Sequence, residues 1–225
     1  MGYLILIPKW FLMYSIFLEI IFAIITLTVS YYAFKVYKLT YKNNAKLFTT
    51  AFVFIFLSYL TKLMLNLIVV GKLADDVVSV INLRDVALLN LFGSYAHALF
   101  FIIGLIILAY IQFRTENIQI LFLTIALVVV SIIFSWNKLM LFYLLATIIL
   151  MFICFNYFLN YLCHRTINST LVLIAMMFLL LGTLQYFFAL DYELYYVVGH
   201  IFEFLSYALI LINLLLILKH GKKKK

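Results

Sequence analysis

Six polar side chains, five of them ionisable, lie within long apolar stretches of this chain. An ionisable group inside a membrane-spanning helix costs about 2.5–3.5 kcal/mol on insertion scales, so it usually faces the bundle interior and pairs with another polar group. These side chains are therefore the candidates for a binding site or a proton relay: Glu19, Lys62, His97, Gln185, His200 and Glu203.

Neighbouring polar residues extend most of these positions into stripes along a helix. Side chains three, four or seven residues apart share one helix face. At about 1.5 Å of rise per residue, the six candidates are expected roughly 8–16 Å below the outer membrane surface. If the stripes converge, they line one outward-facing polar pocket: Ser15 with Glu19; Ser58, Lys62 and Asn66; Asn90, Ser94 and His97; His200, Glu203 and Tyr207.

The charges of these residues predict which of them contact one another in the pocket. A lysine and a glutamate that face each other inside the bundle each cost less than either does alone. We therefore expect Lys62 to contact Glu19 or Glu203, with Glu203 orienting His200 or sharing a proton with it. His97 and His200 are expected to flank the same cavity. The alternative is that these residues only hold the helices together through hydrogen bonds.

Cofactor chemistry has little support in the spacing. His97, His200 and Glu203 are a weak candidate set for zinc, which prefers four tetrahedral N, O or S ligands. The two histidines are expected at different depths, which disfavours a bis-histidine haem. An imine on Lys62 is conceivable because buried lysines can be neutral nucleophiles. No catalytic residue and no cofactor are predicted.

The elements that must position these residues are membrane-spanning helices. The chain has 225 residues, of which 68% are hydrophobic and 11% charged, whereas a soluble domain is about half apolar and a quarter charged. About 20 apolar residues span the hydrocarbon core, where only a helix satisfies its own backbone. We therefore predict an all-α polytopic membrane protein, a single seven-helix transmembrane domain over residues 1–225. Its helices lie near 11–33, 47–70, 86–111, 118–135, 139–162, 170–190 and 195–218.

Basic residues predict the orientation of this bundle. Eleven Lys and Arg residues fall at one end, in 34–46, 112–117, 163–169 and the C-terminal tail, and four fall at the other. The positive-inside rule then places the N-terminus outside and the C-terminus inside. This placement explains the net charge of +8 without nucleic acid as a partner. The tail can also bind anionic lipid through Lys222, Lys223, Lys224 and Lys225.

Two further patterns concern the outer surface and the internal order of the chain. An outer belt of aromatic anchors is expected at Tyr3, Trp10, Tyr14, Tyr192, Tyr195 and Tyr196.

A faint similarity of the second and third helices to the sixth and seventh is a sign of a parallel repeat around the fourth, although chance similarity between Leu- and Phe-rich helices explains it better. It rests on Leu57–Leu60 against Leu181–Leu184, and on His97 against His200.

The general plan is similar to heptahelical sensory modules of prokaryotic signalling proteins, but no motif identifies a family. Microbial rhodopsins need a lysine midway along the last helix, and the segment 195–218 has none. Sugar transporters with a 3+1+3 plan carry prolines in their half-bundles, whereas this chain has one proline. We predict a non-enzymatic sensory, scaffold or partner-binding module in the cytoplasmic membrane of a prokaryote, in contact with the lipid bilayer and an unidentified protein. The alternatives are a carrier for an ion, a proton or a small solute that uses the same residues, and a metal- or haem-binding membrane enzyme.

Overall fold

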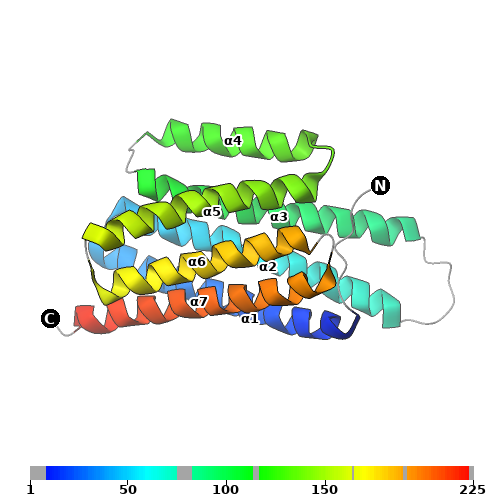
Figure 1. Cartoon of the computed structure of the whole chain (residues 1–225), viewed down its shortest axis with the longest axis horizontal. Helices are drawn as coiled ribbons and strands as arrows, with labels where there is room; N and C mark the ends of the chain where they lie inside the picture. Colours follow the sequence, from blue (N-terminus) through cyan, green and yellow to red (C-terminus); the bar gives the residue numbers. More distant parts are fainter. Residues whose placement is uncertain (1–8, 75–82, 114–116, 164, 190–191, 223–225) are drawn as a thin grey trace.

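The computed structural model describes residues 9–74, 83–113, 117–163, 165–189 and 192–222, and they are almost entirely helical (Figure 1). A short 3-10 turn, Lys9–Phe11, precedes seven α-helices in this part of the chain. The all-α polytopic architecture is therefore confirmed. The helices are α1 (Leu12–Thr40), α2 (Asn43–Ala74), α3 (Leu83–Phe113), α4 (Ile118–Phe134), α5 (Lys138–Cys163), α6 (Ile167–Phe188) and α7 (Glu193–Lys222).

Six of these helices are long and apolar enough to cross a membrane, and α4 is the shorter exception. The 17 residues of α4 span about 26 Å, at the lower limit for a crossing helix. The chain is thus a multi-pass membrane protein.

Several helices continue beyond the predicted apolar segments. The first was expected over 11–33, but α1 continues through Lys35 and Lys38 to Thr40. Lysine is a good helix former, so the helix persists after it leaves the apolar region. It ends at Tyr41, where a left-handed backbone (φ 53°) lets the Tyr41 N–H bond to the Tyr37 carbonyl at 2.7 Å.

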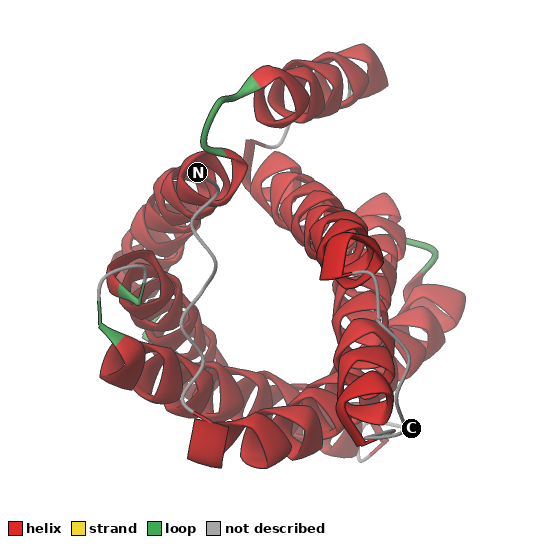
Figure 2. Ribbon diagram, turned by 90° about the vertical axis from the view of Figure 1, so that its right-hand side faces the viewer, coloured by secondary structure: helices red, strands yellow, loops and turns green. Residues whose placement is uncertain are grey.

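Six helices pack into a closed ring, and α4 stands outside it. Around the ring each helix contacts the next, in the order α1, α2, α3, α5, α6, α7 and back to α1, while α4 contacts α3 and α5. Figure 2 shows this ring nearly end-on, with one helix standing apart from it.

The ring divides into two halves of three consecutive helices, α1–α3 and α5–α7. The halves meet along two seams, α3 with α5 and α1 with α7, which are the least extensive contacts in the ring. Helices α3 and α5 run in the same direction, and α4 carries the chain back between them (Figure 1). This is the helix order that a repeat of α1–α3 by α5–α7 requires.

Glycines bring the helices close together within each half. A Cβ on Gly104 of α3 would lie 2.9 Å from the Ala51 carbonyl oxygen of α2, and one on Gly182 of α6 would lie 3.1 Å from the Gly199 carbonyl oxygen of α7. Small residues of this kind let helix backbones approach in membranes, where packing drives association. The tight pairs α2–α3 and α6–α7 carry most of the candidate site.

Candidate functional site

Glu19 is fully buried and has a complete set of partners. The Lys62 ammonium lies 3.2 Å from Glu19 Oε1, and the Asn66 amide donates to Oε1 at 3.0 Å and Oε2 at 2.7 Å. Lys62 and Asn66 lie one helical turn apart on α2, so one stripe supplies both. The expected contact between Lys62 and Glu19 is confirmed.

Lys62 also extends from α2 toward the other half of the ring. Its ammonium lies 5.8 Å from the ring centroid of Tyr186 and 5.6 Å from that of Tyr196, distances at which a cation is attracted to an aromatic face. Its side chain keeps 19% of its surface exposed. Lys62 therefore combines a buried counter-ion with a partly exposed side chain.

Glu203, the second buried carboxylate, is held by hydroxyl groups. Tyr59 donates to Glu203 Oε1 at 2.7 Å, Tyr186 donates to Oε2 at 2.6 Å, and the Tyr207 hydroxyl lies 2.9 Å from that of Tyr59. In the described part of the chain the one salt bridge is that of Lys62 with Glu19. Glu203 is thus solvated by tyrosines instead of being paired with a cation.

His200 lies behind Tyr186. Its Nδ1 is 2.7 Å from the Tyr186 hydroxyl oxygen and 3.2 Å from the Tyr196 carbonyl oxygen. The Tyr186 hydrogen is already used on Glu203, so His200 Nδ1 carries a proton that it shares between these two oxygens. The other ring nitrogen, Nε2, is buried with no hydrogen-bond partner among the described residues, which fits a neutral imidazole better than a charged one.

His97 joins α3 to α2. Ser58 Oγ lies 2.6 Å from His97 Nδ1 and 3.0 Å from the His97 carbonyl oxygen. The predicted polar face of Ser58 and Lys62 on α2 thus meets the predicted polar face of His97.

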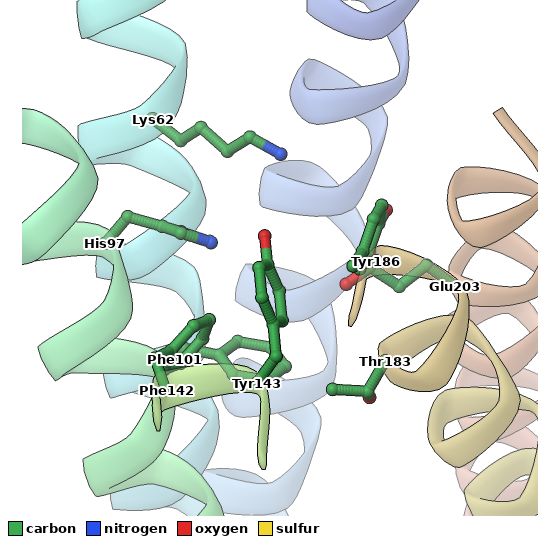
Figure 3. Close-up of a pocket in the computed structure, with 8 residues that line it drawn as sticks. All are labelled: Lys62, His97, Phe101, Phe142, Tyr143, Thr183, Tyr186 and Glu203. Carbon is green, nitrogen blue, oxygen red and sulfur yellow. The ribbon is translucent and has the colours of Figure 1, made fainter. Parts of the chain in front are cut away.

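A small cavity separates these groups, and both halves of the ring line it (Figure 3). It offers about 10 Å³ to the centre of a water-sized sphere, close to what one water molecule needs. In Figure 3, Lys62 and His97 extend from one side, and Tyr186 and Glu203 lie on the other. The lining residues are Lys62, His97 and Phe101 from α2 and α3, and Phe142, Tyr143, Thr183, Tyr186 and Glu203 from α5, α6 and α7.

Not all the candidates reach this cavity. His97 lines it, but His200 does not and connects to it through Tyr186, so the expectation that both histidines flank one cavity is wrong. Gln185 lies apart from its lining, and its buried side-chain oxygen has no hydrogen-bond partner in the part of the chain that the structure describes. The predicted stripe of α3 cannot be followed to Asn90, whose side chain is outside the described set.

Tyr196 corrects the predicted aromatic belt. Trp10, Tyr14, Tyr192 and Tyr195 are exposed as an outer belt requires, whereas Tyr196 is 1% exposed and packs on the ring of His200. Tyr3 lies outside the described residues. The sequence reasoning also missed Tyr59, Tyr143 and Tyr186, to which it assigned no role in the site.

The geometry gives no support to a metal centre. Among the described residues, no three His, Cys, Asp or Glu side chains come together in a way that would hold a metal ion. His97, His200 and Glu203 are therefore better described by their hydrogen bonds to Ser58, Tyr186 and Tyr59.

Comparison with known proteins adds no identity. No protein-family model matches the chain, and neither the curated proteins nor the solved structures contain a match. Function must therefore be argued from the site itself.

Proposed function

We propose that the protein is a non-enzymatic membrane module that binds a small ligand or ion between its two halves and responds by changing how they pack. The observation that carries this proposal is the cavity, whose polar lining comes from both halves. Hydrogen bonds that join Tyr59 of α2 to Glu203 and Tyr207 of α7 cross between the halves beside it. A ligand that alters these bonds acts directly on the seam.

Two features favour a responding module over a carrier. Helices α1, α2, α3 and α7 have 29, 32, 31 and 30 residues without interruption, whereas many carriers bind solutes at broken helices near the midplane. The cavity also has room for about one water molecule. Both features suit a small stimulus better than a transported solute.

A second candidate function is a carrier for a proton or a small cation. It is favoured by two buried carboxylates, Glu19 and Glu203, beside one ammonium, that of Lys62, which pairs with Glu19. Movement of the two halves about their seams would then expose the cavity to each side in turn.

The membrane context is part of the proposal. The lysine-rich end, which includes the turn at Lys42, faces the cytoplasm by the positive-inside rule, in the cytoplasmic membrane of a prokaryote. Lys222, at the end of α7, contacts anionic lipid there together with the three lysines that follow it. Those three lysines lie outside the described residues. In a sensory module this end passes the response to a protein partner.

The test is a distance measurement between the halves by electron spin resonance. With Cys154 and Cys163 replaced by alanine, labels on Lys42→Cys and Ile167→Cys report across the halves. Lys42→Cys with Phe113→Cys reports within one half as the matched control. All three positions are exposed. We expect sodium chloride, potassium chloride, ammonium chloride or a change of pH to move the first distance by about 1–2 Å, the scale of helix shifts, and to leave the second unchanged.

A flux assay separates the two candidate functions. Proteoliposomes that enclose a pH-sensitive dye are given a potassium diffusion potential, with and without a sodium gradient. We expect no flux above that of empty liposomes. Flux that Glu203→Gln abolishes would establish the carrier instead, and a distance insensitive to every probe would overturn the sensory module.

A further inference from the structure

The ring interior holds an unbalanced charge. Among the described residues it contains two buried carboxylates, Glu19 and Glu203, and one ammonium, Lys62. Lys62 and Asn66 saturate Glu19. When all three groups are ionised, the cluster carries one net negative charge, and Glu203 is the carboxylate outside its salt bridge.

With Glu203 ionised, the donor of each hydrogen bond around it follows from the contacts. Tyr59 and Tyr186 donate to its two oxygens, which leaves Tyr207 to donate to Tyr59 and His200 Nδ1 to donate to Tyr186. Every hydrogen along the chain Tyr207–Tyr59–Glu203–Tyr186–His200 thus points toward Glu203. A chain whose hydrogens converge from both ends on one ionised carboxylate is arranged to receive one proton there.

We infer that the ligand of the cavity is a proton and that Glu203 is the group that binds it. This inference rests on the proposed function, because it assigns the stimulus of the same site. The proton binds to one carboxylate oxygen and removes the net charge of the cluster. An O–H bond forms on the carboxylate as one O–H bond of a hydronium ion breaks, and that ion leaves as water.

Groups from every surrounding helix face this position. They include Glu19 on α1, Tyr59 and Lys62 on α2, His97 on α3, Tyr143 on α5, Thr183 and Tyr186 on α6, and Tyr196, His200 and Tyr207 on α7. Lys62 is already paired with Glu19, and we assign His200 the neutral form. Glu203 is thus the carboxylate in this set without a salt bridge.

Protonation of Glu203 Oε1 reverses the hydrogen bond between the halves. The new acid O–H must donate, so Tyr59 becomes the acceptor and turns its own hydrogen toward Tyr207. The Tyr207 hydroxyl then accepts from Tyr59 and must direct its own hydrogen elsewhere. A proton at Glu203 therefore changes the contact of α2 with α7 that lies beside the cavity.

Infrared difference spectroscopy of the full-length protein in lipid nanodiscs tests this assignment. On acidification we expect a positive band from the C=O stretch of a protonated carboxylic acid and loss of carboxylate bands. Glu203→Gln should remove the acid band. The matched control, Glu19→Gln with Lys62→Met, should keep it, because it removes the other buried carboxylate together with its counter-charge.

A second variant pair keeps the test decisive if Glu203→Gln does not fold. Tyr59→Phe and Tyr186→Phe each remove one partner of Glu203, and each should shift the frequency of the acid band. A band that Glu203→Gln leaves intact, or that neither tyrosine variant shifts, assigns the proton elsewhere and overturns the inference.

The outcome for Glu203 is distinguishable from that of the proposed function. If no acid band forms at any pH while sodium chloride changes the distance between the halves, the ligand is a cation, and the proton assignment fails although the sensory module stands. If the acid band forms but no probe moves the halves, Glu203 binds a proton without a response and the proposed function fails.

Discussion

The two buried carboxylates of the ring occupy contrasting environments. Glu19 is fixed within one half by an ammonium at 3.2 Å and two amide hydrogen bonds. Glu203 is held by two tyrosine hydroxyls, one of which reaches it from the other half. Breaking a buried ion pair by removing one partner is costly because a bare charge remains, whereas hydroxyl groups can reverse their hydrogen bonds at little cost. The environment of Glu19 therefore stabilises the fold, whereas that of Glu203 can change state.

Loss of Lys62 should produce the largest effect. We expect Lys62→Met to lower the free energy of unfolding by about 3–5 kcal/mol, because it leaves Glu19 buried without a counter-charge. Steric trapping in micelles measures this quantity. Adding Glu19→Gln should recover most of the loss, and a single variant as stable as wild type would contradict the structural role of the pair.

Glycine substitutions compare the packing of the two halves directly. We expect Gly104→Ala to cost about 1–3 kcal/mol, the range for overpacking, because its Cβ would meet the Ala51 carbonyl oxygen at 2.9 Å. Gly182→Ala, with its nearest contact at 3.1 Å, should cost less by the same assay. The reverse order would mean that the α6–α7 pair is the less adaptable one.

Removal of the Glu203 charge should be milder than removal of Lys62. We expect Glu203→Gln to lower the free energy of unfolding by about 1–2 kcal/mol, since it weakens hydrogen bonds in the membrane without leaving a bare charge. Steric trapping against the Lys62→Met variant gives the comparison. Equal losses in the free energy of unfolding would show that Glu203 stabilises the fold as much as the pair of Lys62 with Glu19 does.

The smallest effect on stability is expected from Tyr59. Tyr59→Phe removes the hydroxyl that bonds Glu203 and Tyr207, at a cost of about 1.2 kcal/mol for the two bonds, since one such bond in a membrane protein averages about 0.6 kcal/mol. It should still broaden the spin-label distance distribution between the halves. Tyr31→Phe, on the exposed side of α1, is the control and should change neither quantity.

The sequence predicted the Glu19 environment because its signals are local. Lys62 and Asn66 lie four residues apart, which places them on one face, and Glu19 was expected at the same depth as Lys62. The observed contact joins these three residues. The fold class was predictable for a similar reason, since apolar run length sets the helices.

The Glu203 environment was less predictable because tyrosine has two properties. In a hydropathy pattern Tyr59 and Tyr186 count as apolar residues, and their hydroxyls matter only once the helices are placed beside one another. Tyr196 was assigned to the outer belt for the same reason. The order of helices around the ring also lacks a sequence signal, because helices that are apolar on nearly all sides do not indicate which neighbour they contact.

The position of α4 outside the ring has a consequence for how such a chain is assembled. A unit with an odd number of membrane crossings, copied directly in tandem, would enter the bilayer upside down relative to the first copy. One helix that runs back between two such units restores the original direction, and α4 runs back along α3 before α5 begins. The shortest helix of the protein, with few buried residues of its own, thus lets α1–α3 and α5–α7 share one polarity.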